Sequence, residues 1–213
     1  MKPDETRLNS EMEIRLASGP TRVVEPDGRE CDVFLLPSDP ARLEELFRDL
    51  FQNHWSEIVF GPLIEGAAWE MRPAHPPTHI GMTDGYLTIA FGVPHFDICI
   101  GVPKGSPHDP VPASVAQGRK TSRAELYRLL APTGAPVSWG IRLFNGKGEQ
   151  QINILLGNPF VDPQTDRVLK SPDWSRLALW DYLRARWFGL TEPDDFDRSG
   201  RVTLYDIFAN DDS

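Results

Sequence analysis

Few of the features that mark secreted, membrane-spanning or disulfide-rich proteins occur in this sequence. Its two cysteines, Cys31 and Cys99, cannot build a disulfide framework, which favours a reducing, cytoplasmic location. No apolar run approaches the roughly 20 residues that cross a bilayer, so we expect no membrane partner. The opening 15 residues are rich in charge and lack the apolar segment of a secretory signal.

Basic residues are also scarce. The 22 Lys and Arg against 31 Asp and Glu leave a formal net charge of −9, and no Lys/Arg cluster is present to neutralise phosphates, which argues against a nucleic-acid partner. The sequence contains no GxxxxGKS/T or GxGxxG loop, hence no nucleotide-cofactor motif, and no GxSxG nucleophile elbow. We therefore expect a small-molecule ligand, and a homo-oligomer is compatible with these features.

The residues that are plentiful indicate a folded domain. Hydrophobic residues make up 40% of the chain, with six Trp and eleven Phe, which excludes a wholly disordered protein. Nine of the 20 prolines cluster in three stretches, 73–77, 103–112 and 132–136, which predict stiffened loops. We expect a loose tail over 1–10, a single domain over 11–190 and an acidic C-terminal extension over 191–213. The usage of Pro, Arg and Asp suggests a bacterial protein.

Three segments have helical periodicity. A helix is predicted after Ser38-Asp39-Pro40, where an N-cap and an early proline precede apolar residues at helical spacing. A second is predicted from Thr121-Ser122 to Pro132, on the spacing of Leu126, Leu129 and Leu130. A third begins at Ser171-Pro172-Asp173 and stops at Gly189.

Between these segments the period changes to two. Residues 86–92 and 95–101 predict one hairpin, and residues 137–144 and 149–156 predict another around an Asn-Gly-Lys-Gly turn. A strand over 78–82 would extend the first hairpin into a meander. Shorter strands are expected at 11–16, 31–36 and 63–71, and 101–120 is interpreted as a long irregular connection. Because helices and hairpins are separate in sequence, we predict an α+β fold: an antiparallel sheet (meander plus hairpin) with about three helices packed on one face.

Alternation divides each hairpin into an apolar face and a polar face. The polar face of the first hairpin carries Tyr86, Thr88, Ala90, His95, Asp97 and Cys99, and that of the second carries Ser138, Gly140, Arg142, Gln151 and Asn153. Small residues beside polar ones leave room for a ligand, and Tyr86, Arg142 and Asn153 would bind a polar or anionic substrate. The alternative is a solvated sheet surface, which antiparallel sheets commonly have.

Histidines and carboxylates gather in the same region. Imidazole and carboxylate groups ligate zinc, iron, nickel or copper, and the candidate metal ligands are His54, Glu65, His79 and His95. His95 and Asp97 share a face and are the candidate catalytic pair, as a base with its orienting carboxylate. A turn over Thr83-Asp84-Gly85 would put His79 on the opposite face, whereas a one-residue bulge would bring both histidines together. The alternative is that His54 caps or packs at a helix end and that His79 and His95 are ordinary hydrogen-bonded strand residues.

Residues 195–206, DFDRSGRVTLYD, place oxygen-bearing side chains at alternate positions. Asp195, Asp197 and Ser199 stand at positions one, three and five, Gly200 at six and Asp206 at twelve. This pattern resembles the calcium loops of EF-hand and dockerin proteins, and the resemblance implies a structural Ca²⁺ ion. It covers only 12 of the 213 residues, and Asp206 replaces the usual EF-hand glutamate. The alternative is an acidic, solvated turn.

These observations support two functional hypotheses. The first is a small-molecule enzyme, with or without metal assistance, whose His/Asp site lies on the polar face of the sheet. The second is a non-catalytic protein that binds a small ligand on that face or pairs there with another subunit. The sequence leaves open whether the protein is an enzyme.

Overall fold

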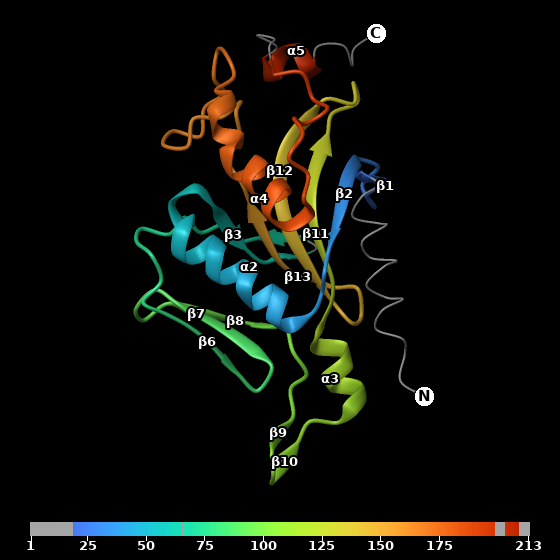
Figure 1. Ribbon diagram of the computed structural model, residues 1–213, viewed down its shortest axis with the longest axis vertical. Coiled ribbons are helices and arrows are strands. Elements are labelled where there is room, and N and C mark those ends of the chain that lie inside the picture. Colours follow the sequence, from blue (N-terminus) through green and yellow to red (C-terminus); the bar gives the residue numbers. More distant parts are fainter. Residues whose placement is uncertain (1–18, 65, 199–202, 209–213) are drawn as a thin grey trace. The chain divides into compact units, whose positions relative to one another are not determined.

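The computed structural model describes residues 19–64, 66–198 and 203–208 (Figure 1). A six-stranded sheet contains, in spatial order, β1 (Thr21–Val24), β2 (Glu30–Leu36), β11 (Thr121–Leu130), β12 (Pro136–Asn145), β13 (Gln150–Leu155) and β3 (Val59–Gly61). A three-stranded sheet contains β6 (His79–Thr83), β7 (Tyr86–Ala90) and β8 (His95–Cys99). Two short ribbons pair β4 (Leu63–Ile64) with β5 (Ala67–Ala68) and β9 (Gly105–Ser106) with β10 (Asp109–Pro110).

The described helices are α2 (Pro40–Asn53), α3 (Ala113–Arg119), α4 (Ala178–Phe188) and α5 (Leu204–Phe208), with 3-10 turns η1 (Trp55–Glu57) and η2 (Trp174–Leu177). Antiparallel sheets and helices separated in sequence make an α+β fold, as predicted. The predicted meander and hairpin are both confirmed, but they belong to separate sheets.

The chain divides into two compact units. The first comprises the described parts of Met1–Leu35, Leu126–Trp139 and Gly157–Ser213, and the second comprises Leu36–Glu125 and Gly140–Leu156. Residues of β11 and β12 occur in both units.

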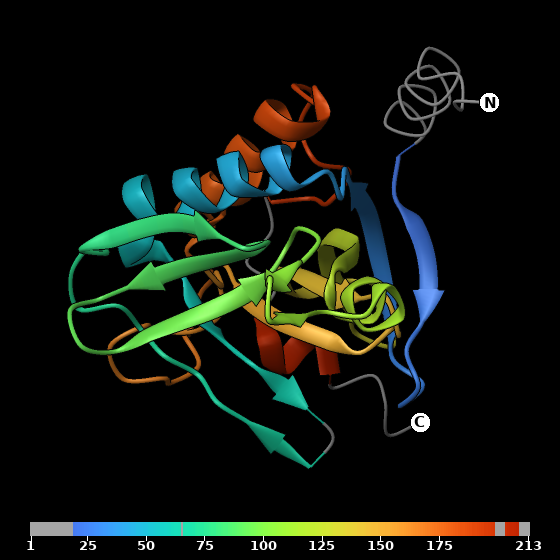
Figure 2. The same ribbon diagram turned by 90° about the horizontal axis from the view of Figure 1, so that it is seen from below.

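The second unit is organised around α2. The Asp39 carboxylate accepts hydrogen bonds from the N–H groups of Ala41 and Arg42, which confirms the predicted N-cap. Phe51 on the buried face of this helix contacts Phe60 of β3 and Phe96 of β8, with ring centroids 5.0 and 5.7 Å apart. Figure 2 shows α2 lying along the three-stranded sheet. The apolar face of this sheet is therefore its core face.

Polar contacts fix the end of β8 within the second unit. The carbonyl oxygen of Cys99 accepts hydrogen bonds from the Thr121 hydroxyl, at 3.1 Å, and from the Gln151 amide, at 3.2 Å. Gln151 was assigned to the polar face of the second hairpin, and its side chain ties the meander to β11 and β13 instead of reaching solvent.

The first unit packs α4 against β2. Phe34 makes edge-to-face contacts with Trp180 and Phe188, with centroids 5.8 and 5.7 Å apart. On β2 and β11 a separate apolar cluster contains Cys31, Val33 and Tyr127. Both faces of β2 therefore carry buried residues.

The predicted helix from Thr121 to Pro132 is wrong, because this segment is β11. Seven of its ten residues are buried, on both sides of the strand. A strand buried on both faces shows no alternation, so three leucines can imitate helical spacing. The interpretation of 101–120 as irregular is also wrong, because it contains β9, β10 and α3. The helices predicted after Ser38 and Ser171 are confirmed as α2 and as η2 with α4.

Candidate functional site

Strand register brings the two predicted strand histidines to one face of the β6–β7–β8 sheet. Thr83 pairs directly with Tyr86, so the turn between them has only two residues, Asp84 and Gly85, with φ of 46° and 82°. His79 consequently pairs with Ala90, which pairs in turn with His95. Neither of the two alternatives left open by the sequence is right, because the turn is shorter than three residues and no bulge is needed to align the histidines.

Polar side chains on this face contact one another. The Thr88 hydroxyl donates a hydrogen bond to the Asp97 carboxylate, and Nε2 of His95 lies 4.0 Å from Oδ2 of Asp97. The His79 ring lies over Gly81, where an added Cβ would stand 2.6 Å from its Nε2. The side chains of His95 and Asp97 are 57% and 47% exposed. The pair could exchange protons with a small molecule, but about half of each side chain is open to water.

Tyr86 and Cys99 form the other end of the same face. They are directly paired across β7 and β8, and Tyr86 is half-buried. Burial raises the pKa of the Cys99 thiol, whose Sγ donates to the carbonyl of Gly101 at 3.4 Å. A protonated, buried thiol is a poor nucleophile.

Arg142 and Asn153 are directly paired across β12 and β13, as their predicted common face requires. Nε of Arg142 donates to Oε2 of Glu125 at 2.6 Å, and both side chains are largely buried. Glu125 also pairs with Arg123, whose guanidinium lies 3.9 Å from the Phe144 ring centroid. A substrate anion at Arg142 would therefore compete with Glu125.

Of the remaining predicted transition-metal ligands, only His54 can be located. His54, at the end of α2, contacts Glu57 through Nδ1 at 2.8 Å, and Glu65 lies outside the described residues. Within the described part of the chain, no three His, Cys, Asp or Glu side chains gather in a way that could hold a metal ion.

The acidic carboxylates of the calcium-like loop have other partners. Asp195 accepts a hydrogen bond from Arg128 at 2.6 Å, and Asp206 accepts from the N–H and hydroxyl of Thr203, both at 2.7 Å. The Thr203 hydroxyl in turn accepts from the Asp206 N–H, so this pair is a capping box at the start of α5. Asp197 is exposed, and Ser199 and Gly200 lie outside the described residues. Calcium binding here stays a prediction.

Sequence reasoning missed a cavity in the first unit. The helix α4 ends at Gly189, whose φ of 65° allows the chain to reverse, and the N–H of Leu190 bonds to the carbonyl of Arg184. Between α4 and residues 190–198 lies a cavity of about 620 Å³. Its described lining consists of Asp181, Arg184, Ala185, Leu190, Thr191, Glu192, Pro193, Asp194, Phe196, Asp197 and Arg198.

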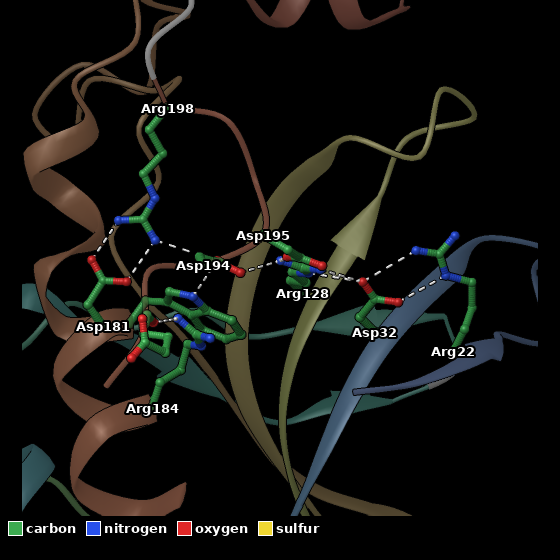
Figure 3. Close-up of polar contacts among 10 residues, drawn as sticks. Arg22, Asp32, Arg128, Asp181, Arg184, Asp194, Asp195 and Arg198 are labelled. Atoms are coloured by element: carbon green, nitrogen blue, oxygen red, sulfur yellow. Dashed lines mark hydrogen bonds and ion pairs between the residues drawn. The ribbon is translucent and has the colours of Figure 1, made fainter. Parts of the chain in front are cut away.

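A buried arginine holds the 190–198 segment in place (Figure 3). The Arg128 side chain is 5% exposed and donates to Asp32 from Nε and Nη2, at 3.0 and 2.8 Å. Its Nη1 lies 2.6 Å from both Asp194 and Asp195. The pKa of Arg128 is raised: burial opposes the charged form, but hydrogen bonds and charges of these aspartates outweigh it.

Asp194 connects this arginine to the helix that walls the cavity. It accepts a hydrogen bond from Nε1 of Trp180 at 2.9 Å and lies 3.5 Å from Arg198. Arg198 also binds Asp181 with two nitrogens, at 2.5 and 2.7 Å. The sequence signal for this network was a charged residue, Arg128, within an otherwise apolar stretch.

Comparison with known proteins identifies the family. The chain belongs to a family of unknown function, DUF7676, whose model matches residues 20–189. No curated protein matches the sequence. Among solved structures, the chain is similar to ChuX, with 14% identity, a TM-score of 0.44 and coverage of 73% of this chain and 76% of ChuX. It is also similar to a protein from Erwinia carotovora, with 14% identity, a TM-score of 0.41 and coverage of 83% and 98%. Likenesses this remote do not indicate a function.

The described helices include none with the length and apolar character that a membrane crossing requires.

Replacing Arg128 with Met is expected to destabilise the protein strongly. The change leaves the carboxylates of Asp32 and Asp194, 4% and 2% exposed, without their buried counter-charge. Breaking a buried ion pair by removing one partner costs about 3–5 kcal/mol. Urea unfolding measures the loss, with Arg42→Met as control, because Arg42 makes an exposed pair with Glu45 worth at most about 1 kcal/mol. Equal losses in the two variants would contradict the role of Arg128.

Acid should remove part of the stability that this network provides. The Arg128 hydrogen bond lowers the pKa of Asp195 from 3.8 to about 2. Burial would raise the pKa of Asp32, but hydrogen bonds from Arg22 and Arg128 outweigh it and lower this pKa. Because the native carboxylates bind protons less readily than the unfolded ones, their contribution is complete above about pH 4 and is lost toward pH 2.

The measurement is the melting temperature of wild type and Asp195→Asn between pH 7 and pH 2. The variant is expected to melt below wild type at pH 7, and the difference should shrink between pH 4 and pH 2. A difference that stays constant over this range would show that the Asp195 charge does not contribute.

Proposed function

We propose that this member of the DUF7676 family is a small-molecule-binding protein and that its ligand occupies the cavity between α4 and residues 190–198. The observation that carries the proposal is the cavity itself. Its volume of about 620 Å³ falls within the roughly 300–1,000 Å³ of ligand sites, and its lining combines apolar surface with six charged side chains.

The cavity walls are held by contacts that do not require a ligand. Arg128 fixes Asp194 and Asp195, and the Arg198 guanidinium fixes the segment to Asp181 on α4. Phe196 packs edge-to-face on Trp174, with centroids 5.4 Å apart. A site whose walls are already ordered loses little conformational entropy when a ligand binds.

The chemistry of the lining supports binding rather than catalysis. The described lining residues include no histidine or cysteine, and three of the charged ones, Asp181, Asp194 and Arg198, bind one another in ion pairs. Such groups hold and orient a molecule but are not placed to move protons during a reaction.

A ligand-detected NMR screen of amino acids, carboxylates, sugars and nucleosides tests the proposal. Ala185 is exposed on α4 and lines the cavity, so Ala185→Trp fills the cavity with an indole without entering the core. At least one compound is expected to bind wild type and to bind Ala185→Trp at least tenfold more weakly.

The matched control is Ala41→Trp, the same exchange at an exposed position of α2, which should leave binding unchanged. If no compound distinguishes the two variants, the cavity is not a ligand site.

A second candidate function is acid–base or metal-assisted chemistry on the polar face of β6–β7–β8. The observation that favours it is the strand register, which aligns His79 and His95 two strands apart, about 10 Å, with Asp97 beside them. His95 and Asp97 would be the central groups, and His79 a further ligand for zinc, iron, nickel or copper.

Metal content and zinc titration of tag-free protein test this candidate. The metal-assisted form of this candidate requires that wild type bind one equivalent and that His95→Ala and His79→Ala bind at least tenfold more weakly, although no three ligands are gathered among the described residues. The control is His108→Ala, which removes an exposed histidine of the same unit. Metal-free wild type, or equal binding by all three variants, would exclude the metal-assisted form of the second candidate.

The proposal includes a cytoplasmic location. Both cysteines are buried free thiols, which a reducing compartment preserves.

A further inference from the structure

We infer that Arg184 in this cavity binds the carboxylate of a small zwitterionic molecule of the amino-acid type. The inference rests on the proposed function, because it assigns the ligand class of the same cavity.

Arg184 is a buried cation whose donors are mostly unused. The residue is 8% exposed and lines the cavity, yet its enclosed Nε has no hydrogen-bond partner among the described residues. Within the same part of the chain, its Nη1 donates to the backbone carbonyl of Glu192, at 3.3 Å. Among the described residues, no carboxylate forms an ion pair with Arg184. A guanidinium offers five N–H donors, and burying it without a counter-charge is costly, so a ligand anion is the missing partner.

The lack of a partner does not reflect a lack of acidic residues nearby. Asp181 stands one turn before Arg184 on α4, but its carboxylate binds Arg198. Asp194 lines the same cavity, but it binds Arg128 and Trp180. Figure 3 shows these pairs on either side of the segment, with Arg184 on the helix beside them. Two arginines of this region therefore have carboxylate partners, whereas no carboxylate in the described part of the chain pairs with Arg184.

The remaining charges select the kind of anion. Four acidic side chains and two arginines line the cavity, so a phosphate or a dicarboxylate would meet a net negative surface. A single carboxylate suits the planar guanidinium, which can bind it with two parallel hydrogen bonds. A cationic amino group on the same ligand would be favoured by Glu192, an exposed residue of the lining.

The apolar lining accommodates the rest of such a molecule. Ala185, Leu190, Pro193 and Phe196 supply carbon surface around the polar groups. An amino acid with an apolar side chain therefore matches the cavity better than a sugar, which would need many hydrogen-bond partners.

Calorimetric titration of the full chain with each standard amino acid and with its amide tests the inference. The amide keeps the ammonium group and side chain and loses only the carboxylate. At least one amino acid is expected to bind wild type at least tenfold more tightly than its amide. In Arg184→Met this preference should disappear, and in Arg184→Lys, which keeps the charge but not the fork of donors, it should be reduced.

Folding of the variants is followed by thermal melting. Because Arg184 has no carboxylate partner among the described residues, Arg184→Met should melt at or above the wild-type temperature, in contrast to Arg128→Met. If Arg184→Met fails to fold, comparing the affinities of an amino acid and its amide for wild type and for Arg184→Lys still tests whether Arg184 binds the carboxylate.

Two results would overturn the inference, and they differ from failure of the proposed function. Compounds that lose binding in Ala185→Trp but bind Arg184→Met as well as wild type would leave the cavity a ligand site without a carboxylate subsite. If every amino acid bound wild type as tightly as its amide did, the cavity would likewise have no carboxylate subsite. A screen with no compound sensitive to Ala185→Trp would instead reject the ligand cavity, and the inference with it.

Discussion

The first unit depends on the guanidinium of Arg128. One buried side chain binds Asp32 of β2 and both Asp194 and Asp195 of the segment that follows α4. These contacts join positions 96 and 66 residues apart in sequence, so a single charge fixes the path of the chain after its last long helix. Buried ion pairs are weak evidence for stability in themselves, but they restrict which backbone arrangements are acceptable. In this protein, the ion pairs of Arg128 hold the segment after α4 on a path that leaves a cavity beside this helix.

The arginines of this protein differ in how their charge is compensated. Arg142 has Glu125, Arg198 has Asp181, and Arg128 has three aspartates. Each of these groups is explained by the fold, because its partner comes from the same chain. Arg184 is also buried, at 8% exposure against 4% for Arg128, but among the described residues it has only a backbone carbonyl within hydrogen-bond distance. An arginine whose charge is balanced by a carboxylate of the same chain has a structural role, whereas Arg184, which has no such carboxylate among the described residues, is the one that we propose binds a ligand.

The parts of the fold that could be predicted are those fixed by local patterns. The Asp39 cap, the Gly189 stop and the alternation of β7 depend on neighbouring residues, and all are confirmed, whereas the alternation of β8 ends at Cys99, which is buried. The strand β11 was predicted to be a helix because both of its faces are buried by tertiary packing. Its apolar residues therefore do not alternate, and the spacing of residues in the sequence cannot reveal such packing.

The candidate sites divide in the same way. The common face of His95 and Asp97 follows from their spacing along one strand, whereas the position of His79 depended on whether Thr83 belonged to the turn or to the strand. Arg142 was singled out without its partner Glu125, and the cavity beside α4 was missed altogether. The Arg142–Glu125 pair and the cavity are formed by contacts between segments distant in sequence, and the spacing of residues along the chain does not indicate such contacts.

The network also bears on the calcium-like loop, because Asp195 belongs to both. A hard cation at the first position of that loop would have to displace Arg128 from the Asp195 carboxylate. Arg128 would retain Asp32 and Asp194, so its burial would still be compensated. The exchange would free one of the contacts that hold the cavity wall, whereas Asp206 would have to leave the capping box of α5. If the loop binds a cation and the cavity binds a ligand, the two are linked through the Asp195 carboxylate, and each would influence the affinity of the other.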